Sequence, residues 1–278
     1  MKVVLFCGGL GLRIREAGEN IPKPMVPIGY RPILWHLMRY YAHYGHKDFV
    51  LCLGYRGDVN KRYFLDYDEC ISNDFVLSNG GKSVKLLASD TDNWSITFVD
   101  TGMDASVGQR LRAVRQHLDG EEMFLANYAD NLSDVPLPAV IDHAKKHDKL
   151  ATFVSVRPSQ TFHVVRTAGD GSSVTAITPA AAGDLWMNGG FMVLKNGIFD
   201  HLHAGEELVV DCFNRLIGLN QLTTYRHGGF WAAMDTFKEK MNLEEMYARG
   251  QAPWEVWRQK ESFPSYTDAP PLTLNPKP

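Results

Sequence analysis

The stretch that decides the fold is KVVLFCGGLGLR at residues 2–13, followed by IPKPM at residues 21–25. The apolar run at residues 2–7 predicts a buried strand, and the glycines after it predict a tight loop. Two cations, Arg13 and Lys23, follow that loop. Backbone N–H groups reach phosphate oxygens where no Cβ stands in the way, so this pattern is typical of a cradle for phosphate groups.

The loop matches neither of the two best-known phosphate-binding motifs. A dinucleotide fingerprint, G-x-G-x-x-G, needs a third glycine where Ile14 stands, and the Walker A motif G-x-x-x-x-G-K-[ST] is absent. From the glycines alone, a tight strand-to-helix turn with incidental basic residues is an equal alternative. The segment is a phosphate loop of a third kind or a structural turn.

Length and composition fit one large α/β domain or two small ones. The chain has 278 residues, of which 45% are apolar and 22% charged, and we expect a domain at 1–258 with a proline-rich tail at 259–278. The net charge of −3 provides no basic field for nucleic acid. Apolar runs of about 18 residues, as a membrane span needs, are absent. Four cysteines without metal-ligand spacing fit a reducing cytoplasm.

Strands and helices alternate through the first half. Strands are expected at 48–53, 95–100, 122–127 and 151–156, and helices at 32–44, 59–67, 108–118 and 138–146. Short connections between them predict right-handed parallel crossovers. The second half favours short strands at 162–166, 174–177, 190–195 and 222–226, with helices near 197–203, 207–219 and 236–249. The pattern predicts an α/β fold: a three-layer α/β/α domain, Rossmann-like, with a mixed, mainly parallel sheet.

Two carboxylates follow predicted strands. Asp130 comes after a strongly apolar strand, and Asp235 follows a Gly-Gly-Phe-Trp turn. Ligands of open α/β sheets bind at the carboxyl ends of the strands, and Mg²⁺ takes one or two carboxylates there together with water and substrate phosphate. Each aspartate also precedes a predicted helix, so a helix N-cap is the alternative for both. Sequence spacing does not decide whether they converge.

Taken together, these segments resemble the nucleoside-diphosphate-sugar pyrophosphorylases, and most of all the glucose-1-phosphate cytidylyltransferase family. The family's G-G-x-G-T-R and K-P-K-P-M motifs are similar to residues 8–13 and 21–25. Further similar segments are P-I-L-W-H at 32–36, V-D-T-G at 99–102, Y-G-D-G-V-S-D at 128–134, W-I-N-G-G-F at 186–191, G-F-W-x-x-M-D-T at 229–236 and A-P-W-x-x-W at 252–257. The resemblance covers nearly the whole chain and implies a nucleotidyltransferase of the GT-A-like kind.

The resemblance also implies roles for individual residues. Lys23, Arg13 and Asp130 would be catalytic, and Asp130 with Asp235 would hold Mg²⁺. The nucleotide would be bound by Leu5, Gly8, Gly9, Gly11, Arg13, Lys23, Gly108, Arg110 and Tyr128. Asn188 and Gly189 would face the acceptor sugar.

The departures from the family pattern fall mostly in the acceptor half. The family's E-K-P, whose lysine grips the sugar phosphate, reads ITP at 177–179, and its G-R-Y-G loop reads QTFH at 160–163. Losing a charged contact to a buried phosphate lowers a rate by roughly 10²–10³ if nothing replaces it. Either another cation replaces the lysine, for which His163 and Arg166 are candidates, or the acceptor is not glucose 1-phosphate.

The reaction expected from these features is an in-line displacement between a nucleoside triphosphate and a phosphorylated small-molecule acceptor. A phosphate oxygen of the acceptor attacks the α-phosphate, with CTP as the expected nucleotide, and pyrophosphate leaves. UTP, dTTP or GTP, a modified sugar phosphate or a phosphonate are alternatives. A regulatory module that binds nucleotide or sugar without catalysis is the alternative from another class. The resemblance further implies a homo-oligomer.

Overall fold

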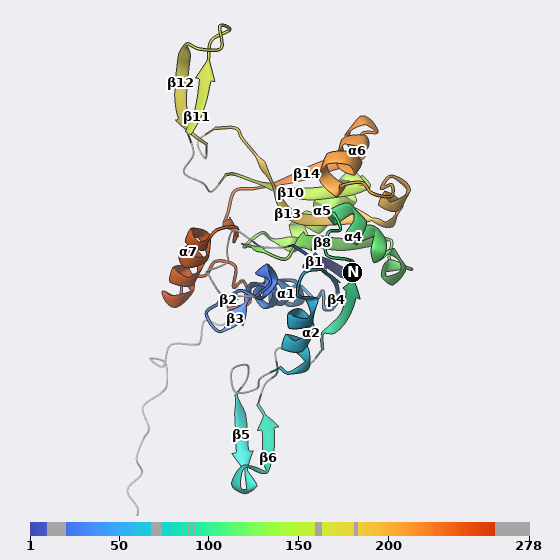
Figure 1. Ribbon diagram of the computed structural model, residues 1–278, viewed down its shortest axis with the longest axis vertical. Coiled ribbons are helices and arrows are strands. Elements are labelled where there is room, and N and C mark those ends of the chain that lie inside the picture. Colours follow the sequence, from blue (N-terminus) through green and yellow to red (C-terminus); the bar gives the residue numbers. More distant parts are fainter. Residues whose placement is uncertain are drawn as a thin grey trace, which may run out of the picture.

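A computed structural model describes residues 1–9, 21–67, 74–87, 89, 91, 93–158, 163–180 and 183–258. Its centre is a seven-stranded sheet in the order β14-β10-β13-β8-β1-β4-β7 (Figure 1). The strands are β1 (Val3–Phe6), β4 (Asp48–Leu53), β7 (Ser95–Asp100), β8 (Met123–Tyr128), β10 (Ala151–Val156), β13 (Met187–Lys195) and β14 (Leu222–His227). Only β13 runs antiparallel to its neighbours, which confirms the predicted mixed, mainly parallel sheet.

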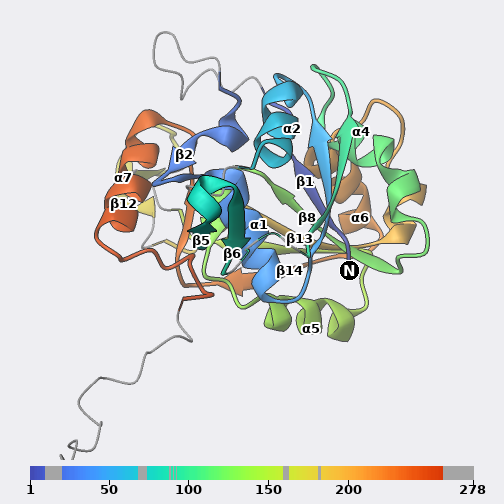
Figure 2. The same ribbon diagram turned by 90° about the horizontal axis from the view of Figure 1, so that it is seen from below.

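Both faces of the sheet are covered, as alternation along β1 shows. Val3 and Leu5 belong to a core with α1 (Ile33–His43) and α5 (Leu137–His147). Val4 and Phe6 belong to a second core on the other face. That second face is covered by α4 (Val107–Ala113), η3 (Arg115–Leu118) and α6 (Asn214–Gly218), as Figures 1 and 2 show. Burial on both faces explains why the opening run is apolar without alternation.

Two hairpins extend from this body at opposite ends (Figure 1). One is β5 (Phe75–Ser78) with β6 (Ser83–Leu86), and the other is β11 (His163–Thr167) with β12 (Val174–Pro179). The remaining elements are η1 (Lys23–Met25), β2 (Pro27–Ile28), β3 (Arg31–Pro32), α2 (Gly57–Leu65), η2 (Asn79–Gly81), β9 (Asn131–Ser133), η5 (Asn196–Asp200), η6 (Leu208–Phe213), β15 (Trp231–Ala233) and α7 (Phe237–Ala248).

The structure differs from expectation at several elements, among them the helix expected near 197–203, which is the 3₁₀ turn η5. The predicted helix at 108–118 is interrupted at Val114 (φ −98°, ψ 3°), so α4 ends at Ala113 and a 3₁₀ turn follows. The predicted helix at 207–219 begins as a π-helical turn, η6. The short strands β9 and β15 were not expected, because runs of three residues carry no periodic signal. In the described part of the chain, no helix has the length and apolar character that crossing a bilayer requires.

Candidate active site

Three charged side chains from distant parts of the chain meet at the carboxyl edge of the sheet. Lys23 Nζ lies 2.5 Å from Asp130 Oδ2 and 2.5 Å from Asp235 Oδ1. Lys23 opens η1, Asp130 follows β8, and Asp235 follows β15. The two carboxylates, whose convergence sequence spacing did not decide, therefore meet, and an ammonium joins them.

Backbone pairing between β9 and β15 brings the two carboxylates together. Ala233 pairs with Asn131 in an antiparallel ladder, and Met234 N donates to Asp130 O at 2.9 Å. The two short strands thereby place Asp130 and Asp235 at the same end of one ladder. Their spacing is set by backbone hydrogen bonds, which hold it more firmly than side-chain contacts would.

Neither carboxylate serves as a helix N-cap. In α7 the N-cap is Thr236, whose side chain accepts from Glu239 N in a capping box. In α5 the N-cap is Pro136, which has no side-chain acceptor. The alternative reading of both aspartates as caps is therefore wrong, and their carboxylates serve the charged cluster.

The electrostatics of the cluster favour a permanently charged lysine. Burial lowers the pKa of Lys23, but the charges and hydrogen bonds of Asp130 and Asp235 outweigh burial and raise it above its usual value. The lysine side chain is 14% exposed, against 27% for Asp130 and 41% for Asp235. Two carboxylates and one ammonium leave a formal charge of −1 at a point open to solvent.

The glycine loop rests on a buried arginine. A Cβ on Gly8 would lie 2.1 Å from Arg110 Nη1, and one on Gly54 would lie 2.9 Å from the same atom. The guanidinium donates to the carbonyls of residues 53, 102 and 103 and to Thr101 Oγ1. At Gly9, by contrast, no atom of the described residues lies within 4 Å of a Cβ. Gly8 is therefore a close-packing glycine, whereas Gly9 has no such contact with the residues that the structure describes.

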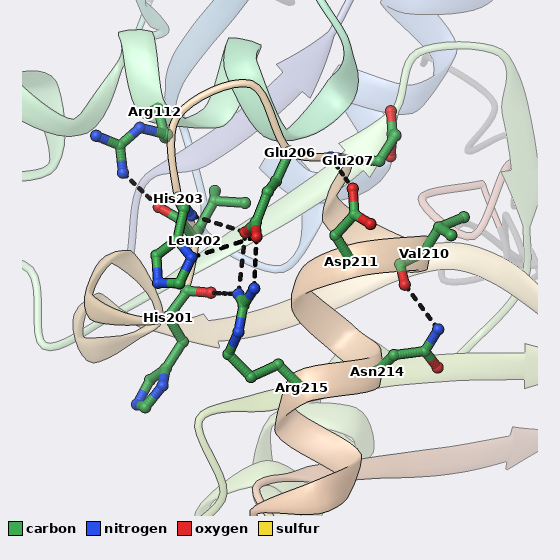
Figure 3. Close-up of polar contacts among 10 residues, drawn as sticks. All are labelled: Arg112, His201, Leu202, His203, Glu206, Glu207, Val210, Asp211, Asn214 and Arg215. Carbon is green, nitrogen blue, oxygen red and sulfur yellow. Dashed lines mark hydrogen bonds and ion pairs between the residues drawn. The ribbon is translucent and has the colours of Figure 1, made fainter.

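Helix α4, which carries Gly108 and Arg110, is anchored to the loop at 201–207. A Cβ on Gly108 would lie 2.3 Å from Glu206 O, and Ser106 Oγ donates to that carbonyl at 3.0 Å. Figure 3 shows how the loop is held: Arg215 contacts Glu206 and the carbonyl of His201. The absence of a side chain at Gly108 thus has a packing reason in addition to its predicted contact with nucleotide.

The residues predicted to face the sugar lie next to Asp130. Burial, then the charges of Glu207 and Asp130, raise the pKa of Tyr128 to about 12, while a hydrogen bond with Asn188 opposes the rise. Asn188 Oδ1 also accepts from Gly190 N at 2.9 Å. Trp231 Nε1 donates to Gly189 O at 2.8 Å. Tyr128 therefore stays neutral at physiological pH and lies within hydrogen-bonding distance of Asn188.

Sequence reasoning missed two residues of this region, Trp231 and Asn131. Trp231 stands against Gly189, and a Cβ on Gly190 (φ 83°) would lie 2.4 Å from Asn131 Nδ2. The signal in the sequence is the glycine pair that follows Asn188, because glycines within a strand indicate that another element packs closely against it. Asn131 is 2% exposed.

Other predicted site residues lie elsewhere or outside the description. The Leu5 side chain is fully buried on the α1 face, so only its backbone can reach a nucleotide. Gly11 and Arg13 lie outside the described residues. His163 begins β11, and Arg166 lies farther along that strand, on the hairpin that projects from the body (Figure 1). Both side chains are exposed, and their predicted role stays a prediction.

Comparison with known proteins places this geometry in context. No family model matches the sequence. A probable glucose-1-phosphate cytidylyltransferase of Bacillus subtilis is 37% identical over 259 residues, covering 92% of this chain and 100% of that protein. The glucose-1-phosphate cytidylyltransferase of Salmonella typhimurium is 35% identical with the same coverage.

Solved structures show the same fold at lower identity. HddC from Yersinia pseudotuberculosis matches with a TM-score of 0.64 and 18% identity, covering 88% of this chain and 99% of its own. A putative glucose-1-phosphate thymidylyltransferase from Bacillus anthracis matches with a TM-score of 0.63 and 14% identity, covering 88% and 94%. With full-length relatives above one-third identity and this fold, the chain belongs to the glucose-1-phosphate cytidylyltransferase family of sugar nucleotidyltransferases.

Proposed function

We propose that this protein transfers CMP from CTP to a sugar 1-phosphate and releases pyrophosphate. The observation that carries the proposal is the convergence of Lys23, Asp130 and Asp235 at the carboxyl edge of the sheet, where β8 lies next to the strand that leads into the glycine loop. The names of the relatives at 37% and 35% identity support CTP as nucleotide and a sugar 1-phosphate as acceptor.

The charge of the cluster supports a divalent cation, and we propose Mg²⁺. A site with a formal charge of −1 repels a triphosphate unless positive charge is added. Oxygens of Asp130 and Asp235 both contact a single cation, the Lys23 ammonium, which a bound metal ion would displace. Within the described ranges, no group of three or more His, Cys, Asp or Glu side chains gathers to form a metal site. Two carboxylates fit Mg²⁺, which completes its shell with water and phosphate.

The chemistry asked of the chain is alignment and charge neutralisation. The oxygen–phosphorus bond from acceptor phosphate to the α-phosphorus forms as the bond to the β-phosphate oxygen breaks. The acceptor phosphate is already ionised, so no general base is required. When bound, Mg²⁺ would neutralise phosphate charge and orient the α-phosphate. Lys23, fully protonated at neutral pH, would stabilise the charge that develops on the phosphate oxygens.

The acceptor half supports a partner other than plain glucose 1-phosphate as the second candidate. The segment that reads ITP at 177–179 in place of E-K-P lies on β12, and Ile177 is 62% exposed. A lysine-free, exposed segment provides no cation for a sugar phosphate. A non-catalytic binding module is disfavoured, because a binder has little use for two carboxylates held at one point.

The test is pyrophosphate release across CTP, UTP, dTTP and GTP, each with several sugar phosphates, and mass detection of the product. We expect release with CTP to exceed that with each other nucleotide. No pyrophosphate from any pair would refute the proposal in favour of the binding module. The highest kcat/KM with another nucleotide would replace CTP while leaving the reaction class in place.

A further inference from the structure

Two arginines meet one tryptophan at the carboxyl edge of the sheet. Arg157 directly follows β10, Trp186 directly precedes β13, and Arg226 lies near the end of β14. Cζ of Arg157 and Cζ of Arg226 each lie 5.0 Å from the centroid of the Trp186 ring. Two like charges are thereby held within about 10 Å of each other, an arrangement that an anion would stabilise.

Strand register places this cluster beside Asn188. Ser155 of β10 pairs with Asn188 of β13 on one side and with Arg226 of β14 on the other. Directly paired residues of neighbouring strands project from the same face, so these three side chains form a row. Strands are about 4.8 Å apart, which puts Arg226 about 10 Å from Asn188 at the backbone. The row leads away from Tyr128 and Asp130, across the part of the edge where the acceptor would lie.

The polar groups in and around this row are arranged so that they could bind a ligand. Ser155 is 4% exposed, and its hydroxyl has no hydrogen-bond partner among the residues that the structure describes. Trp186 Nε1 donates to Asp184 Oδ1 at 2.9 Å, and Arg157 Nη1 donates to Gly183 O at 2.8 Å, so the turn that carries the ring is fixed. A guanidinium stacked on a ring keeps its N–H donors in its own plane, where they can hold a carboxylate or phosphate through two bonds.

We propose that Arg157 and Arg226 bind a second anionic group of the acceptor, remote from the phosphate that attacks CTP. The inference rests on the proposed function and names the acceptor class: a sugar 1-phosphate that carries a carboxylate or a further phosphate. The attacking phosphate has to lie near Lys23 and Asp130, whereas Arg226 is on β14, three strands from β8. One phosphate cannot contact both ends of this row.

This assignment accounts for the rebuilt acceptor half. The hairpin residues 177–179, which replace the family's E-K-P, carry no cation. Arg157 and Arg226 restore positive charge at the acceptor end, but at another position along the edge. Such a shift of the positive charge along the sheet edge is expected if the acceptor carries an anionic group at a different position from the phosphate that the family's lysine binds.

The test compares acceptors of different charge with the full chain and CTP. Pyrophosphate release is measured with glucose 1-phosphate, glucuronic acid 1-phosphate and glucose 1,6-bisphosphate. We expect kcat/KM to be about 10-fold or more higher for one of the two doubly anionic acceptors. A preference for glucuronic acid 1-phosphate identifies the second group as a carboxylate, and a preference for glucose 1,6-bisphosphate identifies it as a phosphate.

Variants then assign the preference to the cluster. Arg226→Gln and Arg157→Gln should reduce the ratio of kcat/KM between acceptors with two anionic groups and the acceptor with one about 10-fold, mainly through KM. Arg226→Lys should retain part of the ratio, because it keeps the charge but not the planar fork. Arg249→Gln, which removes an exposed arginine paired with Glu245 on α7, is the matched control and should leave the ratio unchanged. Thermal midpoints check that each variant is folded.

The experiments distinguish a failure of this inference from a failure of the proposed function. If glucose 1-phosphate has the highest kcat/KM, or if the glutamine variants lower kcat/KM equally for every acceptor, the cluster is structural and the inference is overturned while the proposed function stands. If no acceptor yields pyrophosphate with any nucleotide, the proposed function fails first and the inference falls with it.

Discussion

Replacing Lys23 with methionine removes the cation from between two carboxylates and leaves a side chain of similar length. Asp130 Oδ2 and Asp235 Oδ1 are both 2.5 Å from Lys23 Nζ, so the variant brings two negative charges together with nothing between them. The β9–β15 ladder prevents them from moving far apart, because it fixes their backbones. The variant should therefore be less stable than the wild type in the absence of divalent metal.

The size of the effect follows from charge and exposure. Unit charges about 4 Å apart interact by about 4 kcal/mol at an effective dielectric constant of about 20. Solvent screening at Asp130 (27% exposed) and Asp235 (41% exposed) reduces this, and the variant avoids desolvating an ammonium. We expect a net loss of about 1–3 kcal/mol. For a domain of this size the thermal midpoint should fall by about 2–10 °C.

The assay is thermal unfolding of both proteins with and without Mg²⁺. A divalent cation replaces the missing charge in Lys23→Met, whereas in the wild type it has to displace an ammonium, so Mg²⁺ should raise the midpoint more in the variant. Turnover should fall about 10²–10³-fold. Lys195→Met is the matched control, because Lys195 forms an ion pair with Asp148, whose side chain is 80% exposed, and its loss should be nearly neutral.

An unchanged midpoint in Lys23→Met, together with equal responses of both proteins to Mg²⁺, would show that the carboxylates do not share a cation. The pH dependence gives a second check. Because the folded-state pKa of Lys23 is raised, its stabilisation is fully present below the unfolded value near 10.5 and is lost as pH rises through the folded value. The stability gap between wild type and variant should thus be constant from pH 6 to 9, a window chosen well below that pKa.

Three further predictions follow from the site. Asp130→Asn should lower turnover about 10³-fold or more while the urea midpoint barely changes, and near-normal turnover in Mg²⁺ would remove Asp130 from the metal role. Gly8→Ala should destabilise by about 1–3 kcal/mol in urea titrations because its Cβ meets Arg110, with Gly9→Ala as the nearly neutral control; equal effects would contradict the packing role. Hydrogen bonds from Arg215 and, to a smaller extent, from the backbone of His203 lower the pKa of Glu206 to about 2. In thermal scans, wild type should therefore be more stable than Glu206→Gln above pH 4.5, and this difference in stability should vanish toward pH 2. A difference that persists at pH 2 would refute the prediction.

The sheet and its helices were predictable because their signal is local. Residues 48–53 and 95–100 were expected as strands, and they are β4 and β7 with the same bounds. The helix predicted at 32–44 is α1, Ile33–His43. Long apolar runs and 3–4 spacing report burial directly, so these elements need no knowledge of the tertiary fold.

The residues of the active site could be predicted from the sequence, but the strand pairing that brings them together could not. Asp130 and Asp235 were chosen from strand ends and family resemblance, yet their meeting depends on β9 and β15, which are too short to be seen in a sequence. The Trp186 cluster shows the same limit: Arg157 and Arg226 are 69 positions apart, and only the register of β10 with β14 makes them neighbours. Pairing between distant strands is set by the whole sheet, which no local pattern contains.

The position of the Arg110 side chain beneath the glycine loop limits which substitutions can occur there among homologous sequences. Its guanidinium passes beneath Gly8 and Gly54, at the ends of two neighbouring strands, and neither position has room for a methyl group. A shorter residue at 110 would free the space at position 8, where the three nearest atoms all belong to Arg110, whereas a Cβ at position 54 would still lie 3.0 Å from the Cα of Gly8. Positions 8 and 110 should therefore change together among homologues while position 54 stays glycine, and a transplant of this loop into another scaffold should include all three.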